Sequence, residues 1–355
     1  MTEIPAPFRI PLWNALAARP DVELQVLFLS EHDPRRSYDV HRDDWRFGAR
    51  VLAGRDRLLG RRWLVVNRGV RSALERFRPD LTVVGGWNQP AFFQAARFAR
   101  RHGVPLVAWV ESTARDERSG QGPLELLKRR LVEQADGFLV PGRAAAEYVR
   151  SFGIEQRRIA VAPNAPGLAP ATGDREQLRN ELGIEGCTFL CVSRLSPEKG
   201  VDVLVRAFAG APAELVVAGD GPQEAHVRRL APANVRLVGR VPRDELRRWY
   251  AAADAFALAS RSETWGMALA EAAAAGLPLV ASEAVGAAYD LIEPGVNGML
   301  VPVGDEQALR EAVERIAADD SFRARAGARS RELASGQTPE RWAEAVEQLA
   351  REILL

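Results

Sequence analysis

Short apolar runs alternate with longer amphipathic segments along most of this chain. The runs have the length of strands, whereas the segments between them repeat apolar residues every three to four positions, as helices do. Regular alternation of the two predicts an α/β fold built on parallel sheets. In the first half, the predicted strands are 24–29, 81–84, 106–110, 137–140 and 158–161, and the predicted helices are 8–18, 69–77, 90–102, 123–134 and 144–152.

A proline-rich connector, residues 163–170, separates this pattern from a second one. Because prolines at this density break regular structure, we place a domain boundary here, between a first domain of residues 1–166 and a second of residues 167–337. In doubly wound domains ligands bind at the carboxyl ends of the strands, so the loops that follow the strands are the expected functional region. The predicted strands of the second pattern are 188–192, 215–218, 235–238, 255–258, 279–281 and 299–301, with later helices at 305–318 and 338–353.

The stretch from residue 259 to residue 285 combines a strand end, a loop, an alanine-rich helix, a turn and a second strand. The helix is expected at 266–275, because Gly276 and Pro278 are typical of helix ends. Its first turn offers backbone N–H groups that have no partner within the helix, which favours binding of an anion. The residues at this helix start are Gly266, Met267 and Ala268.

Two glutamates frame that helix start. Glu263 lies in the loop, and Glu271 lies inside the helix among alanines and a leucine. Glu271 is therefore either an ordinary solvated helix residue or a carboxylate that is paired or receives a ligand.

The spacing Glu263, seven residues, Glu271, with Trp265-Gly266 inside it and Gly276-Leu277-Pro278 after it, resembles the E-x7-E signature of retaining glycosyltransferases of the GT-B fold. This is the family that includes sucrose synthases and many bacterial cell-surface glycosyltransferases. The resemblance implies two Rossmann-like doubly wound domains facing across a cleft, with the terminal helix 338–355 packed back on the first. It also implies that Glu271 accepts hydrogen bonds from the ribose of a nucleoside diphosphate sugar, and Glu263 from hydroxyls of the transferred sugar.

A second motif follows the first strand of the second domain, where Ser193-Arg194-Leu195 is followed by Lys199-Gly200. It is similar to the family's G-R-L-x-x-x-K-G segment, with serine in place of the first glycine. Arg194 and Lys199 suit a diphosphate, because a guanidinium chelates oxygens and an ammonium acts as a point charge. A surface ion pair is the alternative. Lys199 is one of only two lysines among 48 basic residues, which favours a functional role.

The resemblance assigns three residues to catalysis, namely Arg194, Lys199 and Glu263. It assigns seven to the donor, namely Trp265, Gly266, Met267, Ala268, Glu271, Gly219 and Val241. We expect neither a cofactor nor a metal, because the chain has no Asp-x-Asp motif and these cations with the helix start can neutralise a departing diphosphate.

The first domain carries the acceptor-side candidates Trp87, Asn88, Glu111 and Ser112, in loops that follow predicted strands. Plain turn chemistry is the alternative for both loops. Many relatives have a histidine after the strand that corresponds to 106–110, and this chain has Glu111-Ser112-Thr113 there, so no catalytic role is assigned on this side.

Bulk composition agrees with a globular enzyme and excludes other classes. The chain is 47% hydrophobic and 27% charged, with a net charge of +1, so a large core is available and nonspecific nucleic-acid binding is not expected. No apolar run reaches the roughly 20 residues of a membrane helix, and the first residues do not form a signal peptide. Cys187 and Cys191 are expected to be core residues of a reduced, cytoplasmic protein.

Residues 35–78 contain thirteen arginines interleaved with Trp and Leu. This segment is either a solvated surface or a surface that meets anionic lipid on the inner face of a membrane. The amino terminus is also unusual, because no strand precedes the first helix although a doubly wound domain needs a central one. We therefore expect that the natural start lies upstream.

The expected activity is that of a retaining, metal-independent glycosyltransferase with a lipid-linked or polysaccharide acceptor. One alternative is a sugar-nucleotide epimerase or hydrolase of the same fold, which would consume the donor without an acceptor. The other is a nonenzymatic subunit that keeps the fold as a scaffold, against which the presence of all four charged motif residues argues.

Overall fold

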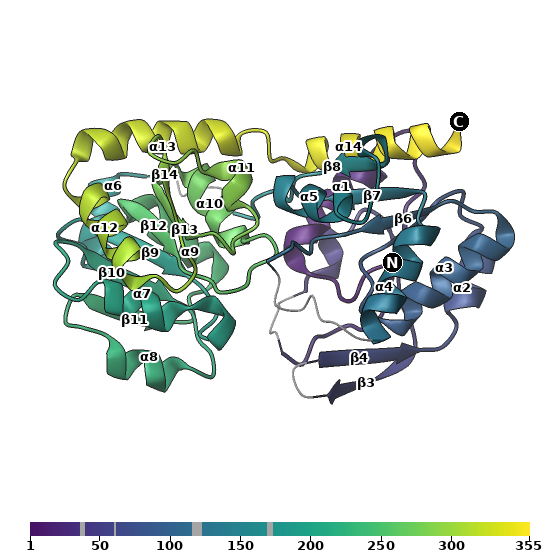
Figure 1. Cartoon of the computed structure of the whole chain (residues 1–355), viewed down its shortest axis with the longest axis horizontal. Helices are drawn as coiled ribbons and strands as arrows, with labels where there is room; N and C mark the ends of the chain where they lie inside the picture. Colours follow the sequence, from purple (N-terminus) through teal and green to yellow (C-terminus); the bar gives the residue numbers. More distant parts are fainter. Residues whose placement is uncertain (36–39, 60–61, 116–122, 169–172) are drawn as a thin grey trace. The chain divides into compact units, whose positions relative to one another are not determined.

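The computed structural model describes residues 1–35, 40–59, 62–115, 123–168 and 173–355, and the chain divides into two compact units. Unit 1 consists of Met1–Ala165 together with Gln337–Leu355, and unit 2 consists of Pro166–Gly336 (Figure 1). Each unit contains a parallel sheet with helices on both faces, as the strand–helix alternation predicts. Among the described residues, no helix is both long enough and apolar enough to cross a bilayer.

The strands of unit 1 are β1 (Gln25–Phe28), β2 (Gly48–Val51), β3 (Gly54–Leu59), β4 (Arg62–Asn67), β5 (Thr82–Val84), β6 (Leu106–Trp109), β7 (Gly137–Val140) and β8 (Ile159–Val161). Its α-helices are α1 (Ile10–Ala17), α2 (Val70–Phe77), α3 (Pro90–His102), α4 (Pro123–Gln134), α5 (Arg143–Arg150) and α14 (Pro339–Leu354). The described part of the unit also contains the short 3₁₀ helices η1 (Pro7–Arg9), η2 (Arg42–Asp44) and η3 (Gln156–Arg158).

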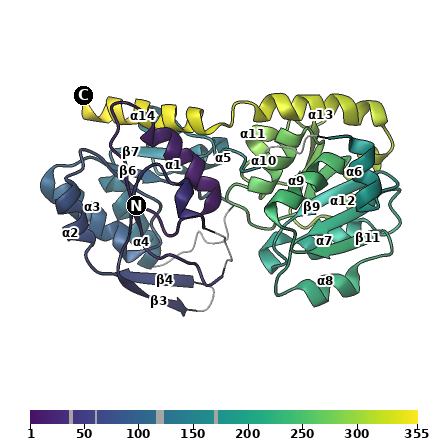
Figure 2. The same ribbon diagram turned by 180° about the vertical axis from the view of Figure 1, so that it is seen from behind.

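The main sheet of unit 1 has the strand order β5-β6-β7-β8, and all its strands are parallel. Side chains alternate between two cores: Phe138 and Val140 of β7 belong to one, and Leu139 belongs to the other. Helices α2 to α5 cover the first core, while α1 and α14 cover the second (Figures 1 and 2). The last helix of the chain is thus part of the unit in which the chain begins.

The first residues of the chain lie between β1 and β5. Thr2 forms a parallel bridge with Phe28, and the amino group of Met1 donates to the carbonyl of Val83. The N–H of Gly85 in turn donates to the Met1 carbonyl at 2.9 Å. These residues occupy the position of a central strand, so that strand is short rather than missing. The expectation of an upstream start stays a prediction.

Residues 48–67 form strands that the sequence pattern did not predict. β2 pairs with β1 in parallel, and β3 and β4 form an antiparallel hairpin in which Asp56 lies opposite Val65 and Leu58 lies opposite Trp63. Trp63 and Val65 are buried against the first core of unit 1. The many arginines hide the alternation of buried and exposed positions in this segment, which explains why the strands were missed.

The strands of unit 2 are β9 (Thr188–Val192), β10 (Glu214–Ala218), β11 (Val235–Gly239), β12 (Ala255–Leu258), β13 (Leu279–Ser282) and β14 (Gly298–Val301). Its helices are α6 (Arg175–Leu182), α7 (Val201–Ala207), α8 (Glu224–Leu230), α9 (Arg243–Ala252), α10 (Met267–Ala275), α11 (Ala288–Leu291), α12 (Glu306–Ala317) and α13 (Asp320–Ala334), with the 3₁₀ helix η4 (Pro197–Lys199).

The sheet of unit 2 has the order β11-β10-β9-β12-β13-β14. Numbered along the unit, this is the order 3-2-1-4-5-6 of a dinucleotide-type doubly wound sheet, whose direction of winding reverses between β9 and β12. The two faces again bury separate cores, with Leu190 of β9 in one and Phe189 and Cys191 in the other. Burial raises the pKa of the Cys191 thiol to about 12, so this cysteine behaves as a core residue.

Local capping fixes several helix ends in this unit. The side chains of Asp174, Asp305 and Asp319 accept hydrogen bonds from first-turn N–H groups of α6, α12 and α13. Gly276 ends α10 in the left-handed conformation, as predicted. The predicted helix 305–318 ends at Ala317, and α13, which follows at once, was not predicted.

Candidate functional site

The loops that follow β9 and β12 meet at the point where the winding of the unit 2 sheet reverses. In open α/β sheets this switch point is where ligands bind, because the flanking loops separate there. The loop after β9 carries Arg194 and Lys199, and the loop after β12 carries Glu263. Three of the residues predicted from separate motifs therefore lie at the carboxyl edge of two neighbouring strands.

Backbone hydrogen bonds hold the loop after β9 against the turn that follows β10. The N–H of Leu195 donates to the carbonyl of Asp220 at 2.7 Å, and the N–H of Gln223 donates to the carbonyl of Leu195 at 2.9 Å. Gly219, predicted as a donor residue, begins this turn, and its N–H donates to the carbonyl of Gly239 at 2.7 Å. The loop that contains Arg194 is therefore fixed by its own main chain rather than by the side chains it presents.

A second set of bonds ties the loop after β9 to the loop after β12. The Glu198 carbonyl accepts hydrogen bonds from the N–H groups of Arg261 and Ser262, at 2.8 and 3.1 Å. The Arg261 guanidinium binds both carboxylate oxygens of Asp202 at 2.8 Å and holds the pKa of Asp202 below its usual value. The sequence pattern gave no indication of this brace, which fixes the distance between the two loops.

The brace brings Lys199 and Glu263 together. The Nζ of Lys199 donates to Oε2 of Glu263, and the two side chains are 21% and 18% exposed. Lys199 therefore does form an ion pair, which was the alternative to diphosphate binding. The pair is only partly exposed, however, and it lies at the switch point of the sheet. Partly solvated pairs contribute little to stability, so a ligand with a larger negative charge can compete for the lysine.

Arg194 has an exposed side chain, and none of the acidic residues that the structure describes forms an ion pair with it. Within the described part of the chain, the loop thus presents a guanidinium without an acidic partner and an ammonium held by a carboxylate.

The loop that leads into α10 is held by main-chain contacts to the segment after β13. Glu263 pairs with Val285 in an isolated parallel bridge, and the N–H of Ala287 donates to the carbonyl of Trp265 at 2.8 Å. Trp265 is 4% exposed and belongs to the core, so it anchors the loop.

Gly266 caps α10 with a φ of 105°, a conformation that side-chain-bearing residues rarely adopt. A Cβ there would lie 2.9 Å from Cγ1 of Val285, so the position has neither the backbone freedom nor the space for another residue. Among the residues that the structure describes, no side chain caps the helix, and the first-turn N–H groups of Met267 and Ala268 are directed away from the helix body. This start of α10 has the positive end of a helix dipole beside the Lys199–Glu263 pair.

Glu271 is half-buried and hydrogen-bonded, rather than an ordinary solvated helix residue. The Tyr250 hydroxyl lies 3.1 Å from Oε2 of Glu271 and 3.3 Å from the carbonyl of Ala268. Burial raises the pKa of Glu271 to about 7, against the opposing effects of the Tyr250 hydrogen bond, the Arg243 charge and the Gly167 backbone N–H. Tyr250, Arg243 and Gly167 were not predicted as site residues, because no motif spacing links them to Glu271.

Val241, the remaining donor candidate, lies two residues after the end of β11 and packs in part against the core that contains Trp265. It lies on the same carboxyl edge of the sheet as the other loops of unit 2.

The acceptor-side candidates of unit 1 are bound into structural networks. Asn88 donates to the Glu3 carboxylate at 2.8 Å, and Glu111 forms an ion pair with Arg9 at 3.0 Å and accepts from Asn164 at 3.2 Å. Trp87 lies 5.1 Å from the ammonium of Lys128, which is also enclosed by the rings of Tyr148 and Phe152. Ser112 follows Glu111 and is half-buried. Within the described part of unit 1, no hydrogen bond or ion pair joins the two loops.

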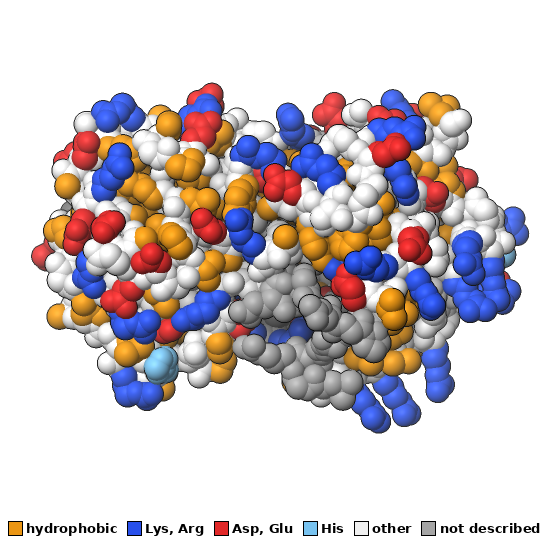
Figure 3. Space-filling view, in the orientation of Figure 1, with side chains coloured by type: hydrophobic (Ala, Val, Ile, Leu, Met, Phe, Trp, Pro, Cys, Tyr) orange, Lys and Arg blue, Asp and Glu red, His pale blue; other side chains and the backbone are white. Residues whose placement is uncertain are grey.

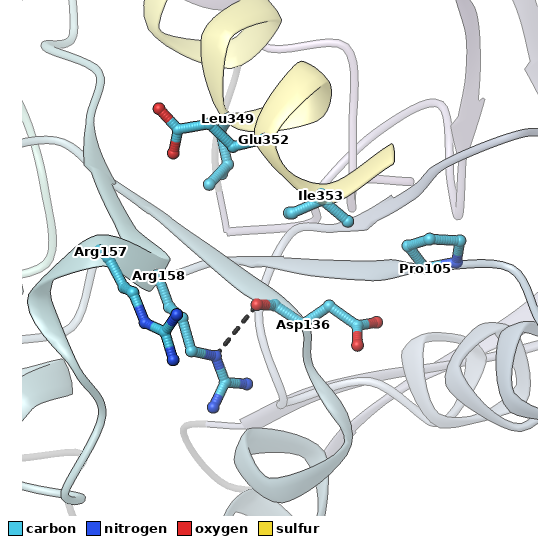
Figure 4. A pocket seen from close by; sticks show the side chains of 7 residues that line it. All are labelled: Pro105, Asp136, Arg157, Arg158, Leu349, Glu352 and Ile353. Carbon is cyan, nitrogen blue, oxygen red and sulfur yellow. Dashed lines mark hydrogen bonds between the residues drawn. The ribbon is translucent and has the colours of Figure 1, made fainter. Parts of the chain in front are cut away.

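A pocket of about 300 Å³ also lies in unit 1, between the end of α14 and the amino ends of β6, β7 and β8 (Figure 4). Its polar lining is already engaged, since Arg158 donates to the Asp136 carbonyl at 3.0 Å. It lies at the opposite edge of the sheet from the loops that follow the strands, so it is separate from the predicted sites. Its lining residues are Pro105, Asp136, Arg157, Arg158, Leu349, Glu352 and Ile353.

Comparison with known proteins agrees with this arrangement of strands and loops. Residues 174–333 match the family model of glycosyl transferases group 1, and residues 11–165 match a glycosyl transferase 4-like domain. Sucrose-phosphate synthase from Thermosynechococcus elongatus has a similar fold, with a TM-score of 0.77 at 21% identity over 99% of this chain and 98% of that one. Anabaena HepE, solved in complex with UDP and glucose, gives 0.76 at 20% identity over the same shares. The fold is GT-B, and the chain belongs to the group 1 glycosyltransferases.

Curated relatives support the same family. A GDP-mannose-dependent alpha-mannosyltransferase of Mycobacterium tuberculosis is 33% identical over 69% of this chain and 66% of the relative. D-inositol 3-phosphate glycosyltransferase 1 of Catenulispora acidiphila is 32% identical over 72% of this chain and 67% of the relative. The chain spans 63% of a second inositol 3-phosphate glycosyltransferase, from Xylanimonas cellulosilytica, so it matches somewhat less than two thirds of some relatives.

Proposed function

We propose that this protein is a retaining, metal-independent glycosyltransferase that moves a sugar from a nucleoside diphosphate sugar to a lipid-linked or polysaccharide acceptor. The observation that carries the proposal is the pairing of Lys199 with Glu263 at the switch point of the unit 2 sheet, beside the uncapped start of α10. Cations, a helix start and a sugar-binding carboxylate are the groups that a diphosphate sugar needs at its reacting end.

In the proposed mechanism, the diphosphate lies against Arg194, Lys199 and the first-turn N–H groups of α10. The bond between the anomeric carbon and the diphosphate breaks, and the acceptor oxygen bonds to the same face of that carbon. The acceptor proton passes to the departing phosphate oxygen, so no separate base is needed. At an effective dielectric near 20, each unit-charge contact at about 4 Å is worth roughly 4 kcal/mol, so two cations can supply much of the stabilisation of the leaving group.

The Lys199–Glu263 pair gives this mechanism a defined starting state. A diphosphate that takes over the lysine leaves the Glu263 carboxylate with free acceptor sites, which hydroxyls of the transferred sugar then occupy. Glu263 serves as a hydrogen-bond acceptor here and forms no covalent bond to the sugar. Glu271 accepts hydrogen bonds from the ribose hydroxyls further along α10.

The names of the relatives narrow the donors to be tested. The mannosyltransferase relative uses GDP-mannose, and HepE was solved with UDP-glucose as well as with UDP. We propose a UDP or GDP hexose as the donor. The residues that would read the base lie near Val241, after β11.

A thermal-shift panel of UDP, GDP, ADP and TDP tests the proposal at the level of binding. One of the four should raise the melting temperature, because a ligand at 100 times its dissociation constant adds about 2.7 kcal/mol of stability. The shift should be lost in Arg194→Ala and Lys199→Ala. Products of the matching donor, assayed with and without saccharide and lipid-linked acceptors, then distinguish transfer from donor hydrolysis or epimerisation. No shift with any nucleotide would favour the scaffold alternative and contradict the proposal.

We also propose that unit 1 contacts anionic lipid through the β3–β4 hairpin. On its outer face Arg55 lies opposite Val66, and Arg57 lies opposite Leu64, so a row of cations runs beside a row of apolar side chains. Val66 is 52% exposed, and neither arginine forms an ion pair with any described residue. Basic side chains project from this part of the molecule in the space-filling view (Figure 3). Such a face suits the boundary between lipid phosphates and acyl chains.

A further inference from the structure

We propose that Arg243 is a positioning residue of the donor site, because it fixes the Gly167 peptide against Glu271 and thereby orients the Glu271 carboxylate for a ribose diol. The inference rests on the proposed function, in which Glu271 receives the ribose. It adds a role for Arg243 and for the connector residue Gly167, neither of which belongs to the motifs found in the sequence.

The contacts of Arg243 carry this inference. Arg243 is the first residue of α9, and its Nη2 donates to the carbonyl oxygen of Gly167. The N–H of Gly167 in turn faces the Glu271 carboxylate. A Cβ on Gly167 would overlap the Arg243 guanidinium and lie 3.5 Å from Oε1 of Glu271, so the glycine backbone fills the space between the two charged groups.

The Glu271 carboxylate is consequently held from two sides. Tyr250 occupies one acceptor position on Oε2 at 3.1 Å, and the backbone N–H of Gly167 donates to the carboxylate as well. An ionised carboxylate has about four acceptor positions, so two remain for neighbouring hydroxyls of a ribose. Because the ring of Tyr250 is buried in the core while Gly167 lies in a loop, the Gly167 side is the one that needs a separate fastening, and Arg243 provides it.

The charges around Glu271 give Arg243 a second effect. Of the elements packed against α10, α9 supplies Tyr250 and Arg243, α13 supplies Arg331 beside Gly276, and α11 carries Tyr289 and Asp290. β12 and β13 carry no titratable side chain. Burial raises the pKa of Glu271 to about 7 and Arg243 lowers it, so removal of Arg243 should raise it further. A protonated Glu271 offers fewer acceptor positions and donates instead.

The test measures the affinity of the full chain for the nucleoside diphosphate that stabilises it, by titration calorimetry between pH 5.5 and pH 8.5. In the unmodified protein the dissociation constant should rise as the pH falls through about 7. Arg243→Gln should raise the dissociation constant at pH 8 at least about fivefold. It should also move the pH at which the dissociation constant begins to rise to a higher value. Arg243→Lys should restore most of the pH profile through its charge while binding stays weaker. Protonation of the nucleotide phosphate near pH 6 is common to all variants, so their difference reports on the protein.

Two controls make the outcome decisive. Arg248→Gln lies on the same helix but removes an ion pair with Glu181, so it should change neither the affinity nor the profile. Glu271→Gln should weaken binding and abolish the component of the profile near pH 7. Normal affinity and an unchanged profile in folded Arg243→Gln, with Glu271→Gln impaired, would overturn the inference alone. Normal binding by Glu271→Gln would instead overturn the proposed ribose contact, and the inference with it.

Discussion

Lys199 and Glu263 lie 64 positions apart in the sequence, yet their side chains form an ion pair at the carboxyl edge of the unit 2 sheet. The pair joins a residue predicted to bind the diphosphate to one predicted to bind the sugar. Each residue lies on its own loop, and the loops are braced by the Glu198 carbonyl and by the Arg261–Asp202 ion pair, so the Lys199–Glu263 pair depends on how the two loops are held.

Replacing Lys199 tests whether a compact ammonium is required. Lys199→Arg should lower kcat at least about tenfold, roughly 1.4 kcal/mol, with a smaller change in the KM for the donor, because the longer planar group cannot occupy the position between Glu263 and the diphosphate. Lys199→Ala should lower kcat by on the order of a hundredfold. Steady-state kinetics measures both variants. Arg315→Lys, which changes an exposed residue of α12, is the control and should leave kcat unchanged. Near-normal turnover in Lys199→Arg would show that any cation suffices.

Removing the Glu271 side chain tests the ribose contact. Glu271→Ala should weaken binding of the bare nucleoside diphosphate by roughly 1.5–3 kcal/mol, the range for hydrogen bonds to a charged group. Calorimetry at pH 8 measures this directly, and Glu314→Ala, on the exposed side of α12, should bind normally. If Glu271→Ala remains folded and binds the nucleotide as tightly as the unmodified chain does, Glu271 does not contact the ribose and the prediction is contradicted.

Glu271 should also make the fold less stable at high pH. Its pKa rises from 4.5 to about 7 on folding, so between these values the folded state holds the proton and the unfolded state does not. Stability from this group is therefore present at low pH and lost as the pH rises through 7. The Glu271→Gln side chain stays neutral at all these pH values. When the pH is raised from 5 to 8, the free energy of unfolding of this variant should therefore increase by about 2–3 kcal/mol relative to that of the unmodified chain. Denaturant unfolding of unit 2 at both pH values checks this, and parallel curves for the two proteins would contradict it.

Gly266 should tolerate no side chain. Gly266→Ala combines a φ of 105° with a Cβ 2.9 Å from Val285, so the start of α10 must shift. We expect a loss of about 1–3 kcal/mol of stability together with loss of the nucleotide-induced thermal shift. Gly304→Ala is the matched control, because its φ is also positive, at 77°, but its Cβ would meet nothing within 4 Å. If both variants keep the nucleotide shift, the geometry of this helix start is not essential for binding.

The lipid proposal is tested with vesicles. Protein should sediment with vesicles containing about one third phosphatidylglycerol and not with pure phosphatidylcholine, and binding should fall steeply between about 0.1 and 0.5 M salt as charges are screened. The double change Arg55→Glu and Arg57→Glu should abolish binding without lowering the melting temperature. The same change at Arg228 and Arg229 of α8 should not affect it. Equal binding to both kinds of vesicle, or none, would contradict the proposal.

Much of the fold is encoded locally. Apolar runs such as those of β7 and β9 are continuous because both faces of a parallel strand are buried, and this made them visible in the sequence. The Gly276 stop of α10 and the Thr338 cap of α14 act through their own neighbours, so they were predictable too. The strands within residues 48–67 were not, because a two-stranded hairpin buries one face only and arginines dominate its other positions.

The sequence by itself determined the α/β class, the strands that carry the site and the identity of Arg194, Lys199, Glu263 and Glu271 as the residues to examine. The class and the strands follow from periodicity, and the four residues follow from the resemblance of two short motifs to the E-x7-E family; both signals lie within a few positions along the chain. Only the tertiary structure decided that Lys199 pairs with Glu263 and that Glu271 bonds to Tyr250, 21 positions away, beside Arg243 and Gly167. Such pairings depend on which strands are neighbours and on how loops cross at the reversal of the sheet. No local pattern of residue types specifies the distance between two side chains held by different loops.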